Sequence, residues 1–390
     1  MKLKELGTIV TGNTPSKQSV ENWDSPDICF VKPDIISDTG ISIIDDAAEY
    51  ISEKARAKAR IVGENSILIT CIGSIGKIGI TAKGTFAFNQ QINAIIPNRK
   101  VNSKYLAYAL LYAKPRLVAI ANAPVVPIIN KSQFGDFEIK VTENTEDQGK
   151  VVEVLDTVNA IIENRRQQLQ KLDDLVKARF IELFGDPVVN PFRWEKQPLG
   201  VVCDVRDGTH DSPEYYESGY PLVTSKNVTG GRIDLTTCSF ISERAYRQIN
   251  ERSKVDMGDI IMPMIGTVGK PVIVDIEPAF AIKNVALIKF PTKSPVRNIY
   301  IRALLESDYF DRAVVSKVRG GTQKFIALGD IRKLEIIIPD NAVQEQFAAF
   351  VEQTDKSKFS LQQQLTELET LKKSLMQQYF GQESGQKDAE

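Results

Sequence analysis

A chain of 390 residues is long enough for two or three domains, and 42% hydrophobic with 25% charged residues is typical of a globular protein, not a disordered one. The net charge of -1 excludes a strong overall attraction to nucleic acid, so any contact with DNA must rest on local positive charge. No stretch approaches the ~18 apolar residues of a membrane span, and the first residues do not resemble a secretory leader. We therefore expect a cytoplasmic chain without membrane contact.

The first 144 residues are rich in β-strand patterns. Short runs of β-branched residues alternate with turns, and one segment has clear helical periodicity. We expect residues 1–144 to form a mixed α/β domain. The expected strands are Ile28 to Val31, Ile41 to Ile44, Ile67 to Ile72, Ile78 to Thr81 and Ile92 to Ile96, and the expected helix is Tyr105 to Ala121.

Residues 145–185 have the periodicity of one long helix. Apolar residues recur at alternating spacings of four and three, which places them in one seam along a helix of about 57 Å. Arg165 and Arg179 are the polar members of this seam. The pattern predicts a coiled-coil helix, whose apolar seam is Val151, Leu155, Val158, Ile162, Leu169, Leu172, Val176 and Leu183.

Residues 191–340 repeat the composition of the first domain, and we expect a second mixed α/β domain there. Its expected strands are Leu222-Val223, Asp259 to Met264, Val272 to Asp275 and Val285 to Phe290, and its expected helix is Tyr300 to Ser316.

Residues 341–381 repeat the long helix with a constant displacement of 196 residues, and residues 382–390 form a polar tail that we expect to be flexible. Thr145 with Gln148, and Asn341 with Gln344, have the spacing of an N-terminal capping box. We favour antiparallel pairing of the two seams within the chain over a coiled coil between two molecules. The second seam has Thr354, Lys358 and Lys372 as polar members and Phe347, Val351, Leu361, Leu365, Leu368 and Leu375 as apolar members.

The duplication extends into the two domains. ILITCIGSIGKIGI at 67–80 matches IIMPMIGTVGKPVI at 260–273, and Leu6-Gly7 matches Leu199-Gly200. The glycines and the lysine suggest a phosphate-binding loop, but Cys71 and Met264 replace the first glycine that such a loop needs. We interpret both copies as tight turns between strands. Such turns can also present side chains to a DNA phosphate, namely Ser74, Lys77, Thr267 and Lys270.

No complete catalytic constellation is present. Asn190-Pro191-Phe192 lacks the second proline of the amino-methyltransferase motif, and no Gly-x-Gly loop accompanies it. Asp34 with Glu138-Ile139-Lys140 suggests a nuclease, but the lysine is absent from the second copy. His210 is the only histidine, and the four cysteines have no Cys-x-x-Cys spacing, so we expect no metal site and free thiols.

The basic residues with the strongest DNA-contact pattern lie near residue 320. Gly320-Gly321-Thr322-Gln323 is flanked by Lys317, Arg319 and Lys324, which combines close backbone approach with side chains that bind phosphates and adenine edges. The alternating run from Lys54 to Arg60 is more typical of a solvated face.

Together these features resemble the specificity subunit of a type I restriction-modification system. The resemblance covers essentially the whole chain. It rests on Gly208-Thr209-His210 with Ser212-Pro213, Met257 to Ile261, Gly266 to Lys270, Gly320 to Lys324, and Leu334 to Pro339 before Gln344. The first half departs from the pattern, because Asn122 to Pro127 replaces the glycine-rich segment and Thr14-Pro15-Ser16-Lys17 lacks the histidine.

The resemblance implies two α/β target recognition domains, at 1–144 and 191–340, that read unlike halves of a split site in double-stranded DNA. The helices at 145–185 and 341–381 are implied to be spacers that dock two adenine methyltransferase subunits, with motor-nuclease subunits joining them. Methyl donor and ATP are expected on those partners, and neither a cofactor nor a catalytic residue is expected on this chain. The candidate DNA-contacting residues are Thr14, Ser16, Lys17, Lys32, Ser74, Lys77, Asn89, Gln90, Thr209, His210, Ser212, Lys226, Asn227, Thr267, Lys270, Lys283, Asn284, Arg319, Thr322, Gln323 and Lys324.

Two alternatives from other functional classes remain at this point. A stand-alone DNA methyltransferase or nuclease would bind a methyl donor or a divalent metal, and the missing motifs argue against both. A purely structural coiled-coil adaptor would leave duplex DNA unbound.

Overall fold

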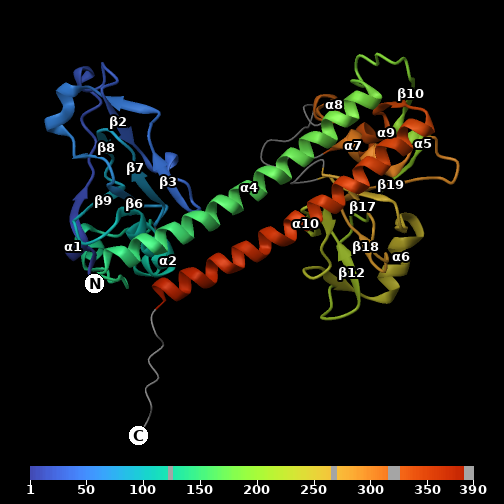
Figure 1. The fold of residues 1–390 in the computed structure, drawn as a ribbon. Coiled ribbons are helices and arrows are strands. Elements are labelled where there is room, and N and C mark those ends of the chain that lie inside the picture. Colours follow the sequence, from blue (N-terminus) through green and yellow to red (C-terminus); the bar gives the residue numbers. More distant parts are fainter. Residues whose placement is uncertain (122–125, 265–269, 315–325, 382–390) are drawn as a thin grey trace, which may run out of the picture. The chain divides into compact units, whose positions relative to one another are not determined.

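The computed structural model describes residues 1–121, 126–264, 270–314 and 326–381, and the chain divides into two compact units (Figure 1). Unit 1 comprises Met1–Arg166 with Gln363–Glu390, and unit 2 comprises Gln167–Gln362. Two long helices are shared between the units. Helix α4 (Thr145–Phe184) begins in unit 1 and ends in unit 2, and α10 (Asn341–Phe380) begins in unit 2 and ends in unit 1.

Unit 1 contains two β-sheets, with strand orders β1-β9-β6-β7-β3 and β4-β2-β8-β5. Neighbouring strands are antiparallel except for the parallel pairs β3–β7 and β2–β8. The strands are β1 (Gly7–Thr11), β2 (Ile28–Val31), β3 (Ile41–Ile44), β4 (Glu49–Ile51), β5 (Ile61–Val62), β6 (Ile67–Thr70), β7 (Ile78–Thr81), β8 (Phe86–Phe88) and β9 (Ile92–Pro97). The helices are α1 (Leu3–Leu6), α2 (Ser103–Ile120) and α3 (Lys131–Asp136), with 3-10 turns η1 (Val20–Asn22), η2 (Pro33–Ile35) and η3 (Glu53–Lys58). The strands expected in this region are confirmed, with ends that differ by at most two residues.

Unit 2 contains the strand orders β11-β19-β16-β17 and β15-β12-β18, together with the pairs β10-β20 and β13-β14. Strands β12 and β18 are parallel, as are β2 and β8 in unit 1. The strands are β10 (Glu195–Pro198), β11 (Asp204–Asp207), β12 (Tyr220–Val223), β13 (Val228–Thr229), β14 (Arg232–Ile233), β15 (Ser239–Ile241), β16 (Ile260–Pro263), β17 (Val272–Ile273), β18 (Ala281–Ile282), β19 (Val285–Lys289) and β20 (Glu335–Ile338). The helices are α5 (Leu199–Val202), α6 (Glu243–Ser253), α7 (Asn298–Leu305), α8 (Asp308–Ala313) and α9 (Leu328–Arg332), with η4 (Ser225–Asn227).

The prediction of a single helix at 300–316 is wrong, because α7 and α8 are separate helices. Ser307 has an extended backbone (φ -87°, ψ 159°), and its hydroxyl donates to the carbonyl of Leu304 at 2.6 Å. A serine that bonds the preceding backbone in this way competes with helix continuation and is favoured just before a new helix. Residues 315 and 316 lie outside the described part of the chain.

The ends of the long helices belong to the domain cores. In unit 2, the ring of Phe184 in α4 lies 4.8 Å from the ring of Tyr300 in α7, between centroids. In unit 1, the ring of Phe380 in α10 lies 5.2 Å from the ring of Tyr105 in α2. Phe184 and Phe380 are 196 residues apart, so the two contacts are copies of each other. Buried aromatic pairs of this kind contribute about 0.5–1.5 kcal/mol beyond the area they bury, which couples each helix end to its domain.

Within each unit, the segments of α4 and α10 run antiparallel, as expected for two paired seams. Lys358 Nζ lies 2.5 Å from Asp173 Oδ1 in unit 2, and Arg166 forms an ion pair with Glu369 (2.7 Å) in unit 1. Every apolar residue predicted in the seams is buried or half-buried. The polar member Lys358 therefore pairs with the opposite helix, and a polar pair of this kind in a seam helps to fix the register of the two helices. None of the described helices is long and apolar enough to cross a membrane.

The capping boxes predicted for Gln148 and Gln344 are wrong. Both side chains are fully buried, and their amides bind the domain instead of the helix terminus. Gln148 accepts from the amide of Asn102 (2.7 Å) and donates to the carbonyls of Lys100 and Thr142. Gln344 repeats this with the amide of Arg297 (2.8 Å) and the carbonyls of Pro295 and Pro339. The sequence pattern is the same in both cases, but two of the three partners of each glutamine lie 46 to 49 residues away, where a local pattern gives no information.

We expect Gln344→Ala to lower the free energy of unfolding by about 2–4 kcal/mol, because it removes the partner of one buried and two partly buried backbone groups. Urea unfolding of the full chain measures this. Gln346→Ala is the matched control, since Gln346 is exposed on the same helix and its removal should change stability by less than about 0.5 kcal/mol. Equal effects of the two substitutions would show that the buried amide does not hold the domain to the helix.

Candidate nucleic-acid interface

In unit 2, the loops that follow several strands meet at one edge of the sheets. Strands β11 and β16 both end opposite the start of β19. Just beyond β11, the amide of Thr209 donates to the carbonyl of Ile282 at the end of β18 (3.0 Å). The amide of Lys283 then donates to the carbonyl of Val223 at the end of β12 (2.9 Å). The loops that carry Thr209, Lys226 and Lys283 are therefore joined by backbone hydrogen bonds.

Unit 1 builds the same edge from its own strands. The amide of Asn13, after β1, donates to the carbonyl of Phe88 at the end of β8 (3.0 Å). The amide of Asn89 donates to the carbonyl of Val31 at the end of β2 (3.1 Å). The turn after β6 joins them, because the amide of Cys71 donates to the carbonyl of Gln91 (2.7 Å).

The loop edge and the helix attachment lie at opposite ends of the sheet in each unit. Strands β9 and β19 run from the loop edge to the far end, and the chain then reaches the residues that bind the buried glutamines, Asn102 and Arg297. Each unit therefore presents its loops away from the point where the helix is fixed.

One glycine in each unit permits the loops to cross. A Cβ atom at Gly12 would lie 2.2 Å from the carbonyl oxygen of Asn89, and one at Gly208 would lie 2.4 Å from that of Ile282. Both distances are too short for any side chain, so the close crossing requires glycine.

His210 is the centre of a hydrogen-bonded cluster on the unit 2 edge. Its Nδ1 lies 2.8 Å from Asn284 Oδ1, and its Nε2 lies 2.8 Å from Asp207 Oδ2. Asp207 also forms an ion pair with Arg252. The bonds to Asn284 and Asp207 raise the pKa of His210, because two oxygen acceptors favour the imidazolium with a proton on each nitrogen. The predicted loop histidine therefore joins the segments that carry Asp207 and Asn284, and Asp207 links this cluster to Arg252.

The structure corrects the alignment of this loop between the two halves. Matching Thr14-Pro15-Ser16-Lys17 with the segment that begins at Thr209 is one residue out. The backbone bonds place Asn13 opposite Thr209, so Thr14 takes the position of His210. In agreement, the hydroxyl of Thr14 lies 2.8 Å from Gln90 Oε1, as His210 lies beside Asn284. The match of Leu6-Gly7 with Leu199-Gly200 is also wrong, because Leu3 and Leu199 make the equivalent backbone bonds.

The candidate lysines of the two edges have different surroundings. In unit 2, Lys283 Nζ donates to the hydroxyl of Ser212 at 2.7 Å, and Lys226 and Lys270 are exposed. In unit 1, Lys17 and Lys32 both form ion pairs with Glu49. These lysines lower the pKa of the Glu49 carboxyl, and the hydrogen bond from Lys32 is the largest cause. The charge is therefore partly neutralised in unit 1.

Three candidates are less available than the sequence implies. Asn89 and Asn227 are buried, and each shapes its own loop: Asn89 Oδ1 accepts from the amide of Gln91, and Asn227 Oδ1 accepts from the amide of Thr224. Lys77 has a side chain only 13% exposed, paired with Asp38 at 3.4 Å.

Ser74 is exposed on the turn between β6 and β7, where Gly73 and Gly76 have φ of 75° and 78°. The tight-turn interpretation of this motif is thus confirmed for the first copy.

Five candidates, Thr267, Arg319, Thr322, Gln323 and Lys324, lie outside the described residues, as do residues 122–125 and the tail 382–390. In unit 2, Met264 directly precedes the segment 265–269, and Ile326 directly follows the segment 315–325. The amide of Ile326 donates to the carbonyl of Met264 (2.9 Å). In unit 1 the matching bond joins Ile129 to Cys71 (2.9 Å).

Sequence reasoning missed the residues that organise the edges, namely Glu49, Gln91, Asp207 and Arg252. Asp207 directly precedes the Gly208-Thr209-His210 motif, so its proximity to His210 could have been expected. Glu49 and Arg252 carried no signal, because their partners are distant in sequence. Among the described residues, no group of three or more His, Cys, Asp or Glu side chains could hold a metal ion.

Comparison with known proteins agrees with this architecture. A family model described as the type I restriction modification DNA specificity domain matches residues 1–173 and again 191–370. The MjaIX type I restriction enzyme specificity subunit of Methanocaldococcus jannaschii is 27% identical over 96% of this chain and 90% of its own length. The HindI specificity subunit of Haemophilus influenzae is 30% identical over 46% of this chain and 40% of its own length.

Solved structures show the same fold. A type I restriction-modification S subunit from M. genitalium matches with a TM-score of 0.55 and 16% identity over 97% of this chain and 95% of that chain. A chain from a structure of type I R-M complex assembly and conformational transition matches with a TM-score of 0.58 and 16% identity, covering 97% and 96%. The chain therefore belongs to the type I restriction-modification DNA specificity family, carries the family's domain twice, and is a DNA-recognition subunit, not a catalytic one.

Proposed function

We propose that this chain reads an asymmetric, two-part DNA sequence and delivers two adenine methyltransferase subunits and motor-nuclease subunits to it in the cytoplasm. Residues 1–144 and 191–340 act as the target recognition domains, and residues 145–185 and 341–381 act as spacers. The methyl donor and ATP bind to the partner subunits. The observation that carries the proposal is one loop edge per unit, built on the same backbone bonds but carrying different side chains.

The difference between the edges supports unlike half-sites. Thr14 with Gln90 offers a hydroxyl and an amide, whereas His210 with Asn284 offers an imidazole and an amide. Hydrogen-bonding groups of different kinds select different base edges in the major groove. The Glu49-paired lysines of unit 1 and the exposed Lys226 of unit 2 should also differ in phosphate contact.

The outer faces of the long helices support docking of partner subunits. Both helices expose apolar side chains outside the paired seam, and contact between these side chains and water is unfavourable. A helix face with apolar residues at these positions suits packing against helices of another chain. The exposed apolar residues are Val154, Ile161, Leu175, Ile181, Phe359 and Leu371.

The proposal is tested by co-expressing the chain with its neighbouring methyltransferase and sequencing the methylated adenines. One asymmetric motif with a constant gap should appear, with half-sites about one helical turn, ~34 Å, apart. Methylation without a split motif, or none despite an assembled complex, would refute the function.

Lys226→Ala should weaken DNA binding by the assembled complex about equally for target and unrelated duplexes, with a salt slope smaller by ~1, because a phosphate contact is lost. Fluorescence anisotropy across a salt series measures both quantities. Lys293→Ala is the control: Lys293 is exposed in the loop after β19, at the end of the sheet away from the loop edge, and should leave the slope unchanged.

Removing one heptad from each spacer, residues 163–169 and 362–368, keeps the seam spacing and shortens each helix by about 10 Å at 1.5 Å per residue. The preferred gap between half-sites should shrink by about three base pairs, while both half-sequences stay the same. The methylated motif of the variant reports both. A changed half-sequence with an unchanged gap would contradict the spacer role of the helices.

A further inference from the structure

One arginine of unit 1 lies at the loop edge without a carboxylate partner. Arg60 directly precedes β5, which pairs antiparallel with β8 so that Ile61 lies opposite Ala87. The start of β5 is therefore beside the end of β8, where the loops of unit 1 meet. Arg60 is exposed, and none of the residues in the described ranges forms an ion pair or a hydrogen bond with its guanidinium.

The backbone at Arg60 is fixed to the loop that follows β1. The amide of Arg60 donates to Asn13 Oδ1 (2.7 Å), and Asn13 Nδ2 donates to the carbonyl of Lys58 (2.7 Å). Asn13 is itself held at the edge, because its amide donates to the carbonyl of Phe88 (3.0 Å). One asparagine thus joins Arg60 to the loop crossing, so only the arginine side chain has to be ordered when it binds a ligand.

Other basic residues in this part of unit 1 are already paired. At the loop edge, Lys17 and Lys32 share Glu49. The three basic residues that precede Arg60 each form an ion pair with a carboxylate, namely Lys54 with Asp24, Arg56 with Glu53, and Lys58 with Glu21. A cation that already has such a partner gains less from a phosphate, because the two anions repel each other. Arg60 is therefore the member of this run whose charge is available to a ligand.

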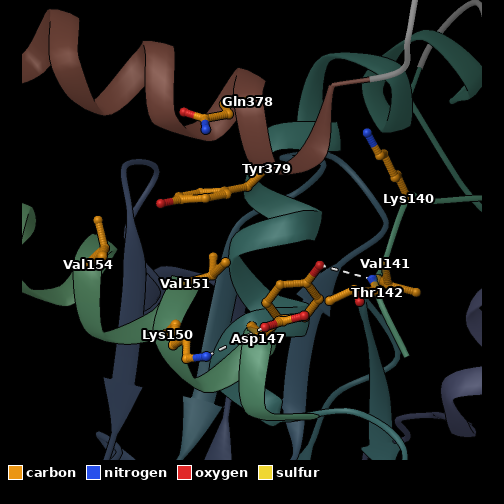
Figure 2. A pocket seen from close by; sticks show the side chains of 10 residues that line it. Lys140, Val141, Thr142, Asp147, Lys150, Val151, Val154, Gln378 and Tyr379 are labelled. Carbon is orange, nitrogen blue, oxygen red and sulfur yellow. Dashed lines mark hydrogen bonds and ion pairs between the residues drawn. The ribbon is translucent and has the colours of Figure 1, made fainter. Parts of the chain in front are cut away.

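The end of the sheet at which Arg60 lies distinguishes it from Arg99. Arg99 is also exposed, and no described residue forms an ion pair with it, but it follows β9 at the far end of unit 1. Figure 2 shows Val154 of α4 and Tyr379 of α10 around a cavity of about 460 Å³ at this end, beside Val141. The far end therefore faces the long helices, whereas Arg60 lies with the loops.

Arg60 also lies at the margin of the loop edge. Strand β5 is the last strand in the order β4-β2-β8-β5, so no further strand of this sheet lies beyond Arg60. The major groove is about 12 Å wide and is bounded on both sides by phosphates. Residues at the margin of a surface that enters the groove therefore meet the DNA backbone, and residues at its centre meet the bases.

We propose that the guanidinium of Arg60 binds a DNA phosphate in the half-site that residues 1–144 read. This assignment rests on the proposed function, because the half-site belongs to a two-part target. A guanidinium is always charged and donates hydrogen bonds in a fixed fork that matches two phosphate oxygens. Phosphate contacts position a protein on the duplex, so Arg60 sets the placement of unit 1 while other side chains of the edge read bases.

The salt dependence of DNA binding by the complex with methyltransferase subunits tests the contact. With Arg60→Ala, the slope of log affinity against log salt should be smaller by about 0.9, the value for one phosphate contact in B-DNA. Arg60→Lys should restore the slope, because a lysine also binds phosphate as a point charge. Arg99→Ala is the matched control, since it removes the same charge from the far end and should leave the slope unchanged. Fluorescence anisotropy of labelled duplexes across a salt series measures all three variants. An unchanged slope with Arg60→Ala, or equal changes in the two alanine variants, overturns the contact.

Duplexes in which single phosphates are replaced by neutral methylphosphonates then locate the contact. One replacement, in one half-site only, should weaken binding by the unaltered chain and have no further effect on Arg60→Ala, because that contact is already missing. Equal effects of every replacement on both chains would refute the contact.

The methylated motif separates this proposal from the proposed function. Arg60→Ala should leave both half-sequences unchanged, and a changed half-sequence would show that Arg60 reads a base, which overturns the phosphate assignment. Full affinity and an unchanged salt slope in an Arg60→Ala complex that still methylates a split motif would refute the role of Arg60 and leave the proposed function intact. Absence of a split motif with the unaltered chain would instead refute the proposed function.

Discussion

Burial of the long-helix ends inside the domain cores is the constraint on which the other features depend. Phe184 and Phe380 lie against Tyr300 and Tyr105, and a fully buried glutamine binds the domain at the start of each helix. A helix joined to its domain only by a flexible loop could not hold the loop edge of that domain at a defined angle. Here both an aromatic contact and three hydrogen bonds per glutamine fix the helix to the sheet end opposite the loops. Orientation of each loop edge is therefore a property of core packing.

The same backbone scaffold carries different side chains at the loop edges of the two units. Gly12 and Gly208 permit the same loop crossing, and the parallel pairs β2–β8 and β12–β18 end at the same place in each unit. Because these bonds involve only main-chain atoms, the side chains above them can vary without loss of the fold. His210 and its acidic partner in one edge, and Thr14 with the Glu49-paired lysines in the other, illustrate that freedom.

The sequence by itself determined the two long helices, their duplication, most of the strands and the family, because these follow from periodicity and motif order over short or regular distances. It did not determine the break at Ser307, the true partners of Gln148 and Gln344, or the pairing of Lys77 with Asp38. It also placed Thr14 one residue away from its counterpart. Apart from the break at Ser307, which a local serine–backbone bond accompanies, each of these depends on contacts between residues far apart in the chain, and only the tertiary structure brings those residues together. The cavity beside Val141 belongs to the same class, since its walls come from α2, α4, α10 and the segment before α4.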